Sequence, residues 1–121
     1  SATKHTLARR LYLDLTGLPP TPEKMRAYLG DETDGAYEML VEELMQRTAY
    51  GERLASMWLN KARYAEDQAH QVGGNIAFFY PNAFKYRKWV IDAFNNDLPY
   101  DDFIRKQLAA DLEKDKSVTD L

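Results

Sequence analysis

The stretch Tyr50–Asp67, YGERLASMWLNKARYAED, carries the longest uninterrupted helical pattern in the chain. Within it Leu54, Trp58 and Ala62 recur at a spacing of four and define one apolar row. Further apolar residues beside this row widen the predicted buried face: Ala55, Met57 and Leu59. Apolar residues on more than one side indicate a central helix, and the alanines let a neighbouring helix come close. We therefore expect the other helices to close around this one.

The charged end of this stretch holds Arg63, Glu66 and Asp67 close together in the sequence. If the helix continues through it, Arg63 and Asp67 stand four apart and can form an ion pair. One interpretation is a polar site, whose carboxylates act as general acid and base or hold a cation. The other is a structural ion-pair network, which we favour because neighbouring helical positions point about 100° apart. The three residues are candidates for a ligand or interaction surface.

The overall composition is that of a globular protein. The chain has 121 residues, of which 45% are hydrophobic and 29% charged, enough for one domain with a stable core. No apolar run approaches the roughly 20 residues that span a bilayer. The net charge of −3 argues against nucleic acid as a partner. We expect a single domain over residues 1–121 that is a fragment of a larger multidomain protein.

Cysteine and histidine usage argues against a metal or haem centre. The chain has no cysteine, which rules out thiolate chemistry, disulfides and cysteine-based zinc sites. The two histidines, His5 and His70, have no second ligand at metal-binding spacing. A Cys-x-x-Cys-His motif is likewise missing, so the chain does not hold a covalent haem. We predict no cofactor and no metal.

Helical periodicity also marks most of the remaining chain. Leucines at a spacing of four predict a helix over residues 4–15, which Gly17 ends in the left-handed conformation. Residues that suit helix N-caps precede the following helices: Thr21 (with Pro22 after it), Asp34, Thr48 and Asn82. A last helix is expected over residues 101–112, with these side chains facing inward: Phe103, Ile104, Gln107, Leu108 and Leu112. Because no strand-type alternation occurs, we predict an all-α fold, a compact orthogonal bundle of five or six helices with one long aromatic-containing loop.

The predicted loop covers residues 68–81, where no helical stripe is found. It contains His70 and then a concentration of apolar and aromatic residues that is unusual for a loop: Ile76, Phe78, Phe79 and Tyr80. Loops of this length are usually functional or mobile. The aromatic half either folds back on its own domain or docks on a partner. Its rings suit a protein surface and a sugar ring equally well.

Several motifs, in order along nearly the whole chain, resemble a known family. The first is Arg9–Thr21, RRLYLDLTGLPPT. The others are Tyr50–Arg53 (YGER), Trp58–Leu59 (WL), Ala62–Ala65 (ARYA), Asn82–Arg87 (NAFKYR), Trp89–Asn95 (WVIDAFN) and Pro99–Phe103 (PYDDF). Together they resemble a domain of unknown function found in large planctomycete and Bacteroidetes proteins, where it commonly follows a cytochrome c domain.

The resemblance implies a context rather than an activity. Proteins with this domain look like exported, multidomain surface or periplasmic proteins, often with a second uncharacterised domain behind this one. No catalytic residues can be carried over from the family. After Ala65 the family tends to have Asp-Ser, whereas this chain has Glu66-Asp67-Gln68.

Three functional hypotheses follow. The first is a non-catalytic helical interaction or ligand-binding module that packs on a neighbouring domain of the same polypeptide. The second is part of an enzyme, possibly carbohydrate-active, whose site a missing C-terminal region completes; Glu66 or Asp67 should then have a raised pKa in a cleft. The third and weaker one is a docking module for a cytochrome c domain. The candidate surface comprises Arg63, Glu66, Asp67, His70, Ile76, Phe78, Phe79 and Tyr80.

Overall fold

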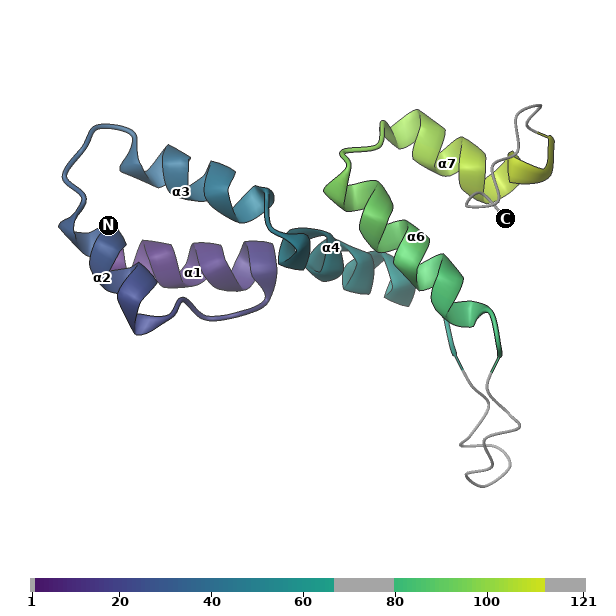
Figure 1. Ribbon diagram of the computed structural model, residues 1–121, viewed down its shortest axis with the longest axis horizontal. Helices are drawn as coiled ribbons and strands as arrows, with labels where there is room; N and C mark the ends of the chain where they lie inside the picture. Colours follow the sequence, from purple (N-terminus) through teal and green to yellow (C-terminus); the bar gives the residue numbers. More distant parts are fainter. Residues whose placement is uncertain (1, 67–79, 113–121) are drawn as a thin grey trace, which may run out of the picture.

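The computed structural model describes residues 2–66 and 80–112, which form six α-helices (Figure 1). They are α1 (Lys4–Thr16), α2 (Pro22–Gly30), α3 (Ala36–Met45), α4 (Thr48–Lys61), α6 (Ala83–Asn95) and α7 (Tyr100–Ala109), followed by a short 3-10 helix (Ala110–Leu112). None of the described residues forms a strand, and the predicted all-α fold is confirmed. Figure 1 shows α1, α2 and α3 at one end of the molecule, α6 and α7 at the other, and α4 between them.

The turn between α1 and α2 follows its local sequence signals. Gly17 has a φ of 71°, and its N–H donates to the Leu13 carbonyl oxygen at 3.1 Å. The Thr21 side-chain oxygen accepts from the Lys24 N–H at 3.3 Å and so caps α2. Pro22 occupies the first turn of α2, where its missing N–H costs nothing. These predicted signals are confirmed, and α2 packs back on α1.

Two predicted N-caps are wrong. The N-cap residue of α3 is Gly35, with a φ of 89°, and not Asp34. The N-cap residue of α4 is Arg47, and Thr48 is already helical. Neither start has a side-chain cap hydrogen bond. Most helical stability in proteins comes from packing of an apolar face, so a helix can begin without a capping side chain. Asn82 is the N-cap residue of α6 as predicted, although its side chain makes no cap hydrogen bond.

Helix α4 is shorter than predicted. Arg63 takes a left-handed conformation, with a φ of 53°. The Tyr64 N–H donates to the Leu59 carbonyl oxygen at 3.0 Å and the Arg63 N–H to that of Asn60 at 3.3 Å, which closes the helix as a Schellman motif. The prediction that the helix continues through Arg63 is wrong. The helical spacing that would pair Arg63 with Asp67 is lost with it.

The buried apolar side chains form two clusters. The first lies among α1, α2 and α3 and contains Ala8, Tyr12, Tyr28, Ala36, Leu40 and Leu44. The second lies among α4, α6 and α7 and contains Ala55, Leu59, Val90, Ala93 and Phe103. Helix α4 packs against α6 and also against α1, so it connects the two clusters.

The buried row of α4 consists of Gly51, Ala55 and Leu59. The row predicted from the sequence is only half-buried or exposed, which corrects the expectation: Leu54, Trp58 and Ala62. Met57, expected to widen the buried face, is 42% exposed. The physical reason is size, because the small residues let α6 approach closely. A Cβ on Gly51 would lie 2.5 Å from the Asn95 side chain of α6.

Helix α7 is less buried than predicted. Phe103 is 3% exposed, and Ile104 and Gln107 are half-buried, as expected for inward-facing residues. Leu108 and Leu112, however, are 80% and 78% exposed, so the prediction that they face inward is wrong. The reason is that α7 packs through the face that carries Phe103 and Gln107, whereas Leu108 lies on another face of the helix and Leu112 lies beyond its end.

Candidate functional site

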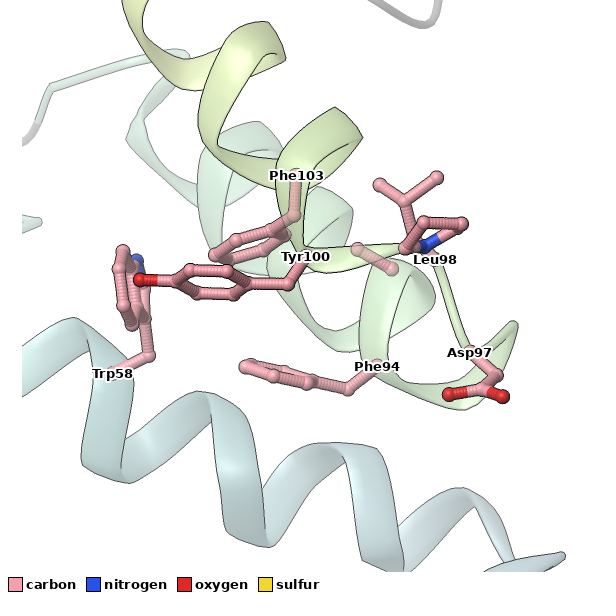
Figure 2. Close-up of a pocket in the computed structure, with 8 residues that line it drawn as sticks. Trp58, Phe94, Asp97, Leu98, Tyr100 and Phe103 are labelled. Atoms are coloured by element: carbon pink, nitrogen blue, oxygen red, sulfur yellow. The ribbon is translucent and has the colours of Figure 1, made fainter.

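The turn between α6 and α7 positions the candidate site. The Leu98 N–H donates to the Ala93 carbonyl oxygen at 2.9 Å and the Asp97 N–H to that of Phe94 at 3.2 Å, so α6 ends in a second Schellman motif. Asp97 has the left-handed φ, 49°, that this motif requires. Pro99, which cannot continue a helix, is the N-cap residue of α7. The chain reverses sharply here and brings the start of α7 opposite α4 (Figure 2).

A cavity of about 400 Å³, here called the aromatic cavity, lies between α4 and this turn. Its walls are aromatic and aliphatic apart from one carboxylate, and are formed by Trp58, Ala93, Phe94, Asp97, Leu98, Pro99, Tyr100 and Phe103. Figure 2 shows the four aromatic rings around one space, with Trp58 at one side and Asp97 at the other. Such walls suit an apolar or ring-shaped group.

Phe103 holds the aromatic walls together. Its ring centre lies 5.0 Å from that of Trp58, 5.2 Å from that of Trp89 and 5.3 Å from that of Phe94. Aromatic pairs at such distances add about 0.5–1.5 kcal/mol each beyond the area they bury. Because Phe103 belongs to the second cluster, the inner wall of the cavity is part of the core.

A polar contact fixes the orientation of the Trp58 indole. Gln107 Oε1 accepts from the Trp58 Nε1–H at 3.1 Å and from the Tyr86 hydroxyl at 2.7 Å. Trp58 Nε1 also lies 3.2 Å from the Tyr86 hydroxyl oxygen. These bonds join α4, α6 and α7 behind the cavity. The indole ring is therefore held in one position before any ligand arrives.

The open side of the cavity presents Tyr100 and Asp97. Tyr100 is 71% exposed, although it is the first residue of α7 and lines the cavity. Asp97 is exposed as well. A tyrosine ring can stack on a flat group, and a carboxylate can accept a hydrogen bond from the same group. The arrangement suits recognition by packing, with one polar contact at the rim.

The surface predicted from the sequence lies at the opposite end of α6. Arg63, Glu66 and Tyr80 belong to the described residues, and the others lie outside them: Asp67, His70, Ile76, Phe78 and Phe79. The Tyr80 N–H donates to the Glu66 carbonyl oxygen at 2.9 Å, so the residues immediately before and after positions 67–79 are hydrogen-bonded to each other. Arg63 is exposed and Tyr80 is 47% exposed. As an interaction surface this set stays a prediction.

Glu66 pairs with a residue that was not predicted. Its Oε1 atom lies 2.5 Å from Arg87 Nε and 2.9 Å from the Tyr64 hydroxyl. The hydrogen bond from Tyr64, and after it that from Arg87, lowers the pKa of the Glu66 carboxyl. Burial, together with the bond to Glu66, raises the pKa of Tyr64. Because a general acid at neutral pH needs a raised pKa, Glu66 is not arranged for that role.

Sequence reasoning missed the aromatic cavity, because its residues come from α4, α6 and α7. One signal was present in Leu98-Pro99-Tyr100, where a proline turn puts a large aromatic residue at a helix start, outside the buried stripe. The sequence predicts the partner ring, Trp58, in the core row of the long helix. Trp58 does pack against the second cluster, but only the observed rotation of α4 shows that it also lines a cavity.

Across residues 2–66 and 80–112, no three histidine, aspartate or glutamate side chains gather closely enough to hold a metal ion. In the same part of the chain, none of the helices has both the length and the apolar character needed to cross a membrane.

The described residues thus form an all-α structure with an aromatic cavity beside the turn between α6 and α7. The chain belongs to the family described as PSCyt2, protein of unknown function (DUF1549), which matches residues 1–120. The resemblance seen in the sequence motifs is thereby confirmed, and the family comprises planctomycete domains of unknown function associated with cytochrome-containing proteins. Neither the curated proteins nor the solved structures include a match to the chain.

Proposed function

We propose that this chain is a non-catalytic helical interaction module of a larger exported protein. In this proposal it binds a neighbouring domain of the same polypeptide through the aromatic cavity. The multidomain context that the family suggests supports the presence of such a neighbour. Export to the periplasm or the cell exterior is part of the proposal and rests on the family resemblance alone.

The exposure of Tyr100 is the observation that carries the proposal. A tyrosine that is 71% exposed beside a cavity with three other aromatic walls leaves a large apolar surface in water. Exposed apolar surface next to a pocket is typical of protein interaction sites, and tyrosine and tryptophan are the residues that most often dominate binding energy there. The indole of Trp58 is already fixed, so little ordering is needed on binding.

The far end of α7 extends the same apolar character. Leu108 and Leu112 are 80% and 78% exposed, and together with Tyr100 they are the most exposed large apolar side chains among residues 80–112. The cavity volume of about 400 Å³ accepts an aromatic or branched aliphatic side chain. We therefore assign the cavity to an apolar side chain of the neighbouring domain, with α7 forming the edge of the interface.

The test is a titration of the chain with the separately produced neighbouring region of its natural polypeptide. Both tryptophans pack against the second cluster, and Trp58 lines the cavity, so tryptophan fluorescence reports binding there. Tyr100→Ser should weaken binding by about tenfold or more, as expected for a central aromatic contact. Tyr37→Ser, at a tyrosine of α3 that is 41% exposed, is the matched control and should have no effect. Equal affinity of the wild-type and Tyr100→Ser chains contradicts the proposal.

A sugar ligand is the second candidate, because the cavity places the Asp97 carboxylate beside exposed aromatic surface. An aromatic ring that stacks on a sugar and a carboxylate that accepts from its hydroxyls are a recurrent combination. Titration with a panel of oligosaccharides, followed through the same fluorescence, tests it. The candidate requires that Asp97→Asn and Tyr100→Ser both weaken binding; a flat titration with the wild-type chain removes it.

Two further functional alternatives are an enzymatic role and binding of a cytochrome c domain. The enzymatic alternative gains nothing from Glu66, whose lowered pKa is opposite to that expected of a general acid. A cytochrome c domain is the weaker alternative partner for the aromatic cavity. Substituting that domain for the neighbouring region in the titration compares the two partners directly.

A further inference from the structure

The four rings of the aromatic cavity differ in what already covers them. The ring centre of Phe103 lies 5.0 Å from that of Trp58, with the two planes at 76°, and 5.3 Å from that of Phe94. Tyr100, by contrast, takes part in none of the ring pairs found among the described residues. Figure 2 shows its ring at the same space as the other three. The cavity therefore presents aromatic surface from several directions, and the Tyr100 ring has no other ring packed on it.

The charges at the cavity are negative. Asp97 is the single charged residue among those that line it. Its side chain is exposed, and no ion pair to it is found among the described residues. Directly after Tyr100, Asp101 and Asp102 share one cation, Arg105, and these three residues together carry one net negative charge. A positively charged group is therefore attracted to the open side of the cavity.

The walls select the kind of cation that fits. An ammonium with N–H groups needs a hydrogen-bond acceptor for each, and burying it against rings alone is costly. The Asp97 carboxylate is the one charged acceptor among the lining residues, and the indole of Trp58 is a donor that already binds Gln107 Oε1 at 3.1 Å. A quaternary ammonium has no N–H group, and its methyl groups pack on aromatic faces while its charge is attracted to them.

We propose that the aromatic cavity binds the quaternary ammonium group of a small compound of the choline class. Its methyl groups lie among the aromatic rings, and Asp97 at the rim attracts its charge. The cavity volume is about 400 Å³. A cavity of about 150 Å³ already holds benzene, so the ammonium group and a short chain both have room.

The same binding makes the cavity a point of regulation. A side chain of the neighbouring domain is proposed to occupy this cavity, so the compound and the domain exclude each other. This competition rests on the proposed function, whereas the binding of the compound does not.

The test follows the indole N–H signal of Trp58 by NMR while the isolated chain is titrated with choline chloride. Sodium chloride keeps the ionic strength constant. The matched control ligand is the neutral alcohol in which a carbon atom replaces the quaternary nitrogen of choline. Choline should give a saturable shift and bind about tenfold more tightly than this alcohol, as expected for a cation held against several rings. No saturable shift with choline, or equal affinity for both compounds, overturns the proposal.

A first variant removes the aromatic face and keeps the apolar surface. Tyr100→Leu should weaken choline binding about three- to tenfold and leave binding of the neutral alcohol nearly unchanged. Tyr100 is 71% exposed, so the change leaves the core intact. Tyr37→Leu, at an exposed tyrosine of α3, is the matched control and should bind choline like the wild type. Wild-type choline affinity in Tyr100→Leu overturns the proposal.

A second variant removes the charge at the rim. Asp97→Asn should weaken choline binding about two- to fivefold, as expected for an exposed charge, and leave binding of the alcohol unchanged. Asparagine tolerates the left-handed φ of 49° at this position, so the turn is kept. Asp14→Asn, on α1, changes the net charge equally and should have no effect. An equal loss in both variants would mean that the charge of the whole chain, and not the cavity, attracts choline, which overturns the proposal.

A competition experiment separates this inference from the proposed function. Saturating choline should weaken the binding of the neighbouring region to the chain, and the neutral alcohol at the same concentration should not. If the neighbouring region binds and choline does not, the inference falls and the proposed function stands. If choline binds and the neighbouring region does not, the proposed function falls and the choline site stands. Simultaneous binding of both overturns the competition.

Discussion

Gly51 sets the closest approach between two helices. Its N–H donates to Asn95 Oδ1 at 2.9 Å, and Asn95 Nδ2 donates to the Thr48 carbonyl oxygen at 3.2 Å. One asparagine of α6 thus satisfies both a donor and an acceptor in the first turn of α4. This contact explains why the row that contains Gly51, rather than the row that contains Trp58, faces α6.

Gly51→Ala should lower the free energy of unfolding by about 1–2 kcal/mol, although alanine is the better helix former. The added Cβ would lie 2.5 Å from the Asn95 side chain, which has to swing away and lose both bonds. Urea unfolding measures the effect. Gly30→Ala, where no atom lies within 4 Å of the added Cβ, is the control and should not destabilise.

The same contact predicts strong coupling between two substitutions. In an Asn95→Ala background the clash is gone, so Gly51→Ala should become neutral or stabilising there. Equal destabilisation by Gly51→Ala in both backgrounds would show that the Asn95 side chain does not set this approach.

Glu43 is a residue at which a change of pH should alter stability. Hydrogen bonds from Lys24, and then from Arg47, lower the pKa of its carboxyl. A lowered folded-state pKa means that the stabilisation is complete above the unfolded value of about 4.3 and is lost as pH falls through the folded value. Glu43→Gln should therefore cost on the order of 0.5 kcal/mol at pH 7, after solvent screening, and nothing at low pH. Urea midpoints of both chains at pH 7 and below pH 3 check this; an equal difference at both pH values contradicts it.

At the scale of helices, two of the endings use a left-handed residue that is not glycine. Arg63 closes α4 and Asp97 closes α6, each in a Schellman motif. The end of α1 can be predicted because a glycine, Gly17, takes the left-handed conformation there. At the end of α4 that conformation falls on Arg63, an ordinary residue, so the sequence pattern predicts a longer helix. Tyr64, which follows Arg63, packs against the second cluster, a tertiary contact that the local sequence does not reveal.

Arg63→Gly should raise the free energy of unfolding by about 0.5–1 kcal/mol. Its φ of 53° is unfavourable for a residue with a Cβ, and its side chain is exposed. Gly17→Ala, at a φ of 71°, is the reverse change and should lower it by about 1 kcal/mol. Thermal and urea unfolding of the two variants compare them directly. A destabilised Arg63→Gly chain would mean that the arginine side chain contributes contacts that outweigh its backbone strain.

Local signals thus predicted that the helices exist and where α1 ends and α2 begins. They could not predict which face of α4 is buried, since both of its apolar rows satisfy the helical period. The choice depends on Asn95, which lies on another helix. The aromatic cavity was missed for the same reason, because Trp58 becomes a cavity wall only once α4 has its observed rotation.

At the scale of the whole molecule, α4 connects two clusters of buried side chains. The prediction of a single domain implies that the clusters unfold together. Leu44, 0% exposed, lies in the first cluster, and both tryptophans pack on the second. Leu44→Ala should cost about 2–5 kcal/mol and shift the transition seen by tryptophan fluorescence as much as that seen by circular dichroism. A fluorescence transition that stays in place would show two independent units.

The proposed binding of a neighbouring domain concerns the surface that the second cluster presents. Hydroxyl-radical labelling of tyrosines, with the chain alone and within its longer natural polypeptide, tests it most directly. Tyr100 is 71% exposed and Tyr37, on α3, is 41% exposed, so both should react in the chain alone. Within the longer polypeptide, labelling of Tyr100 should fall several-fold while that of Tyr37 stays unchanged. Equal labelling of Tyr100 in both would contradict the assignment of the aromatic cavity to a neighbouring domain.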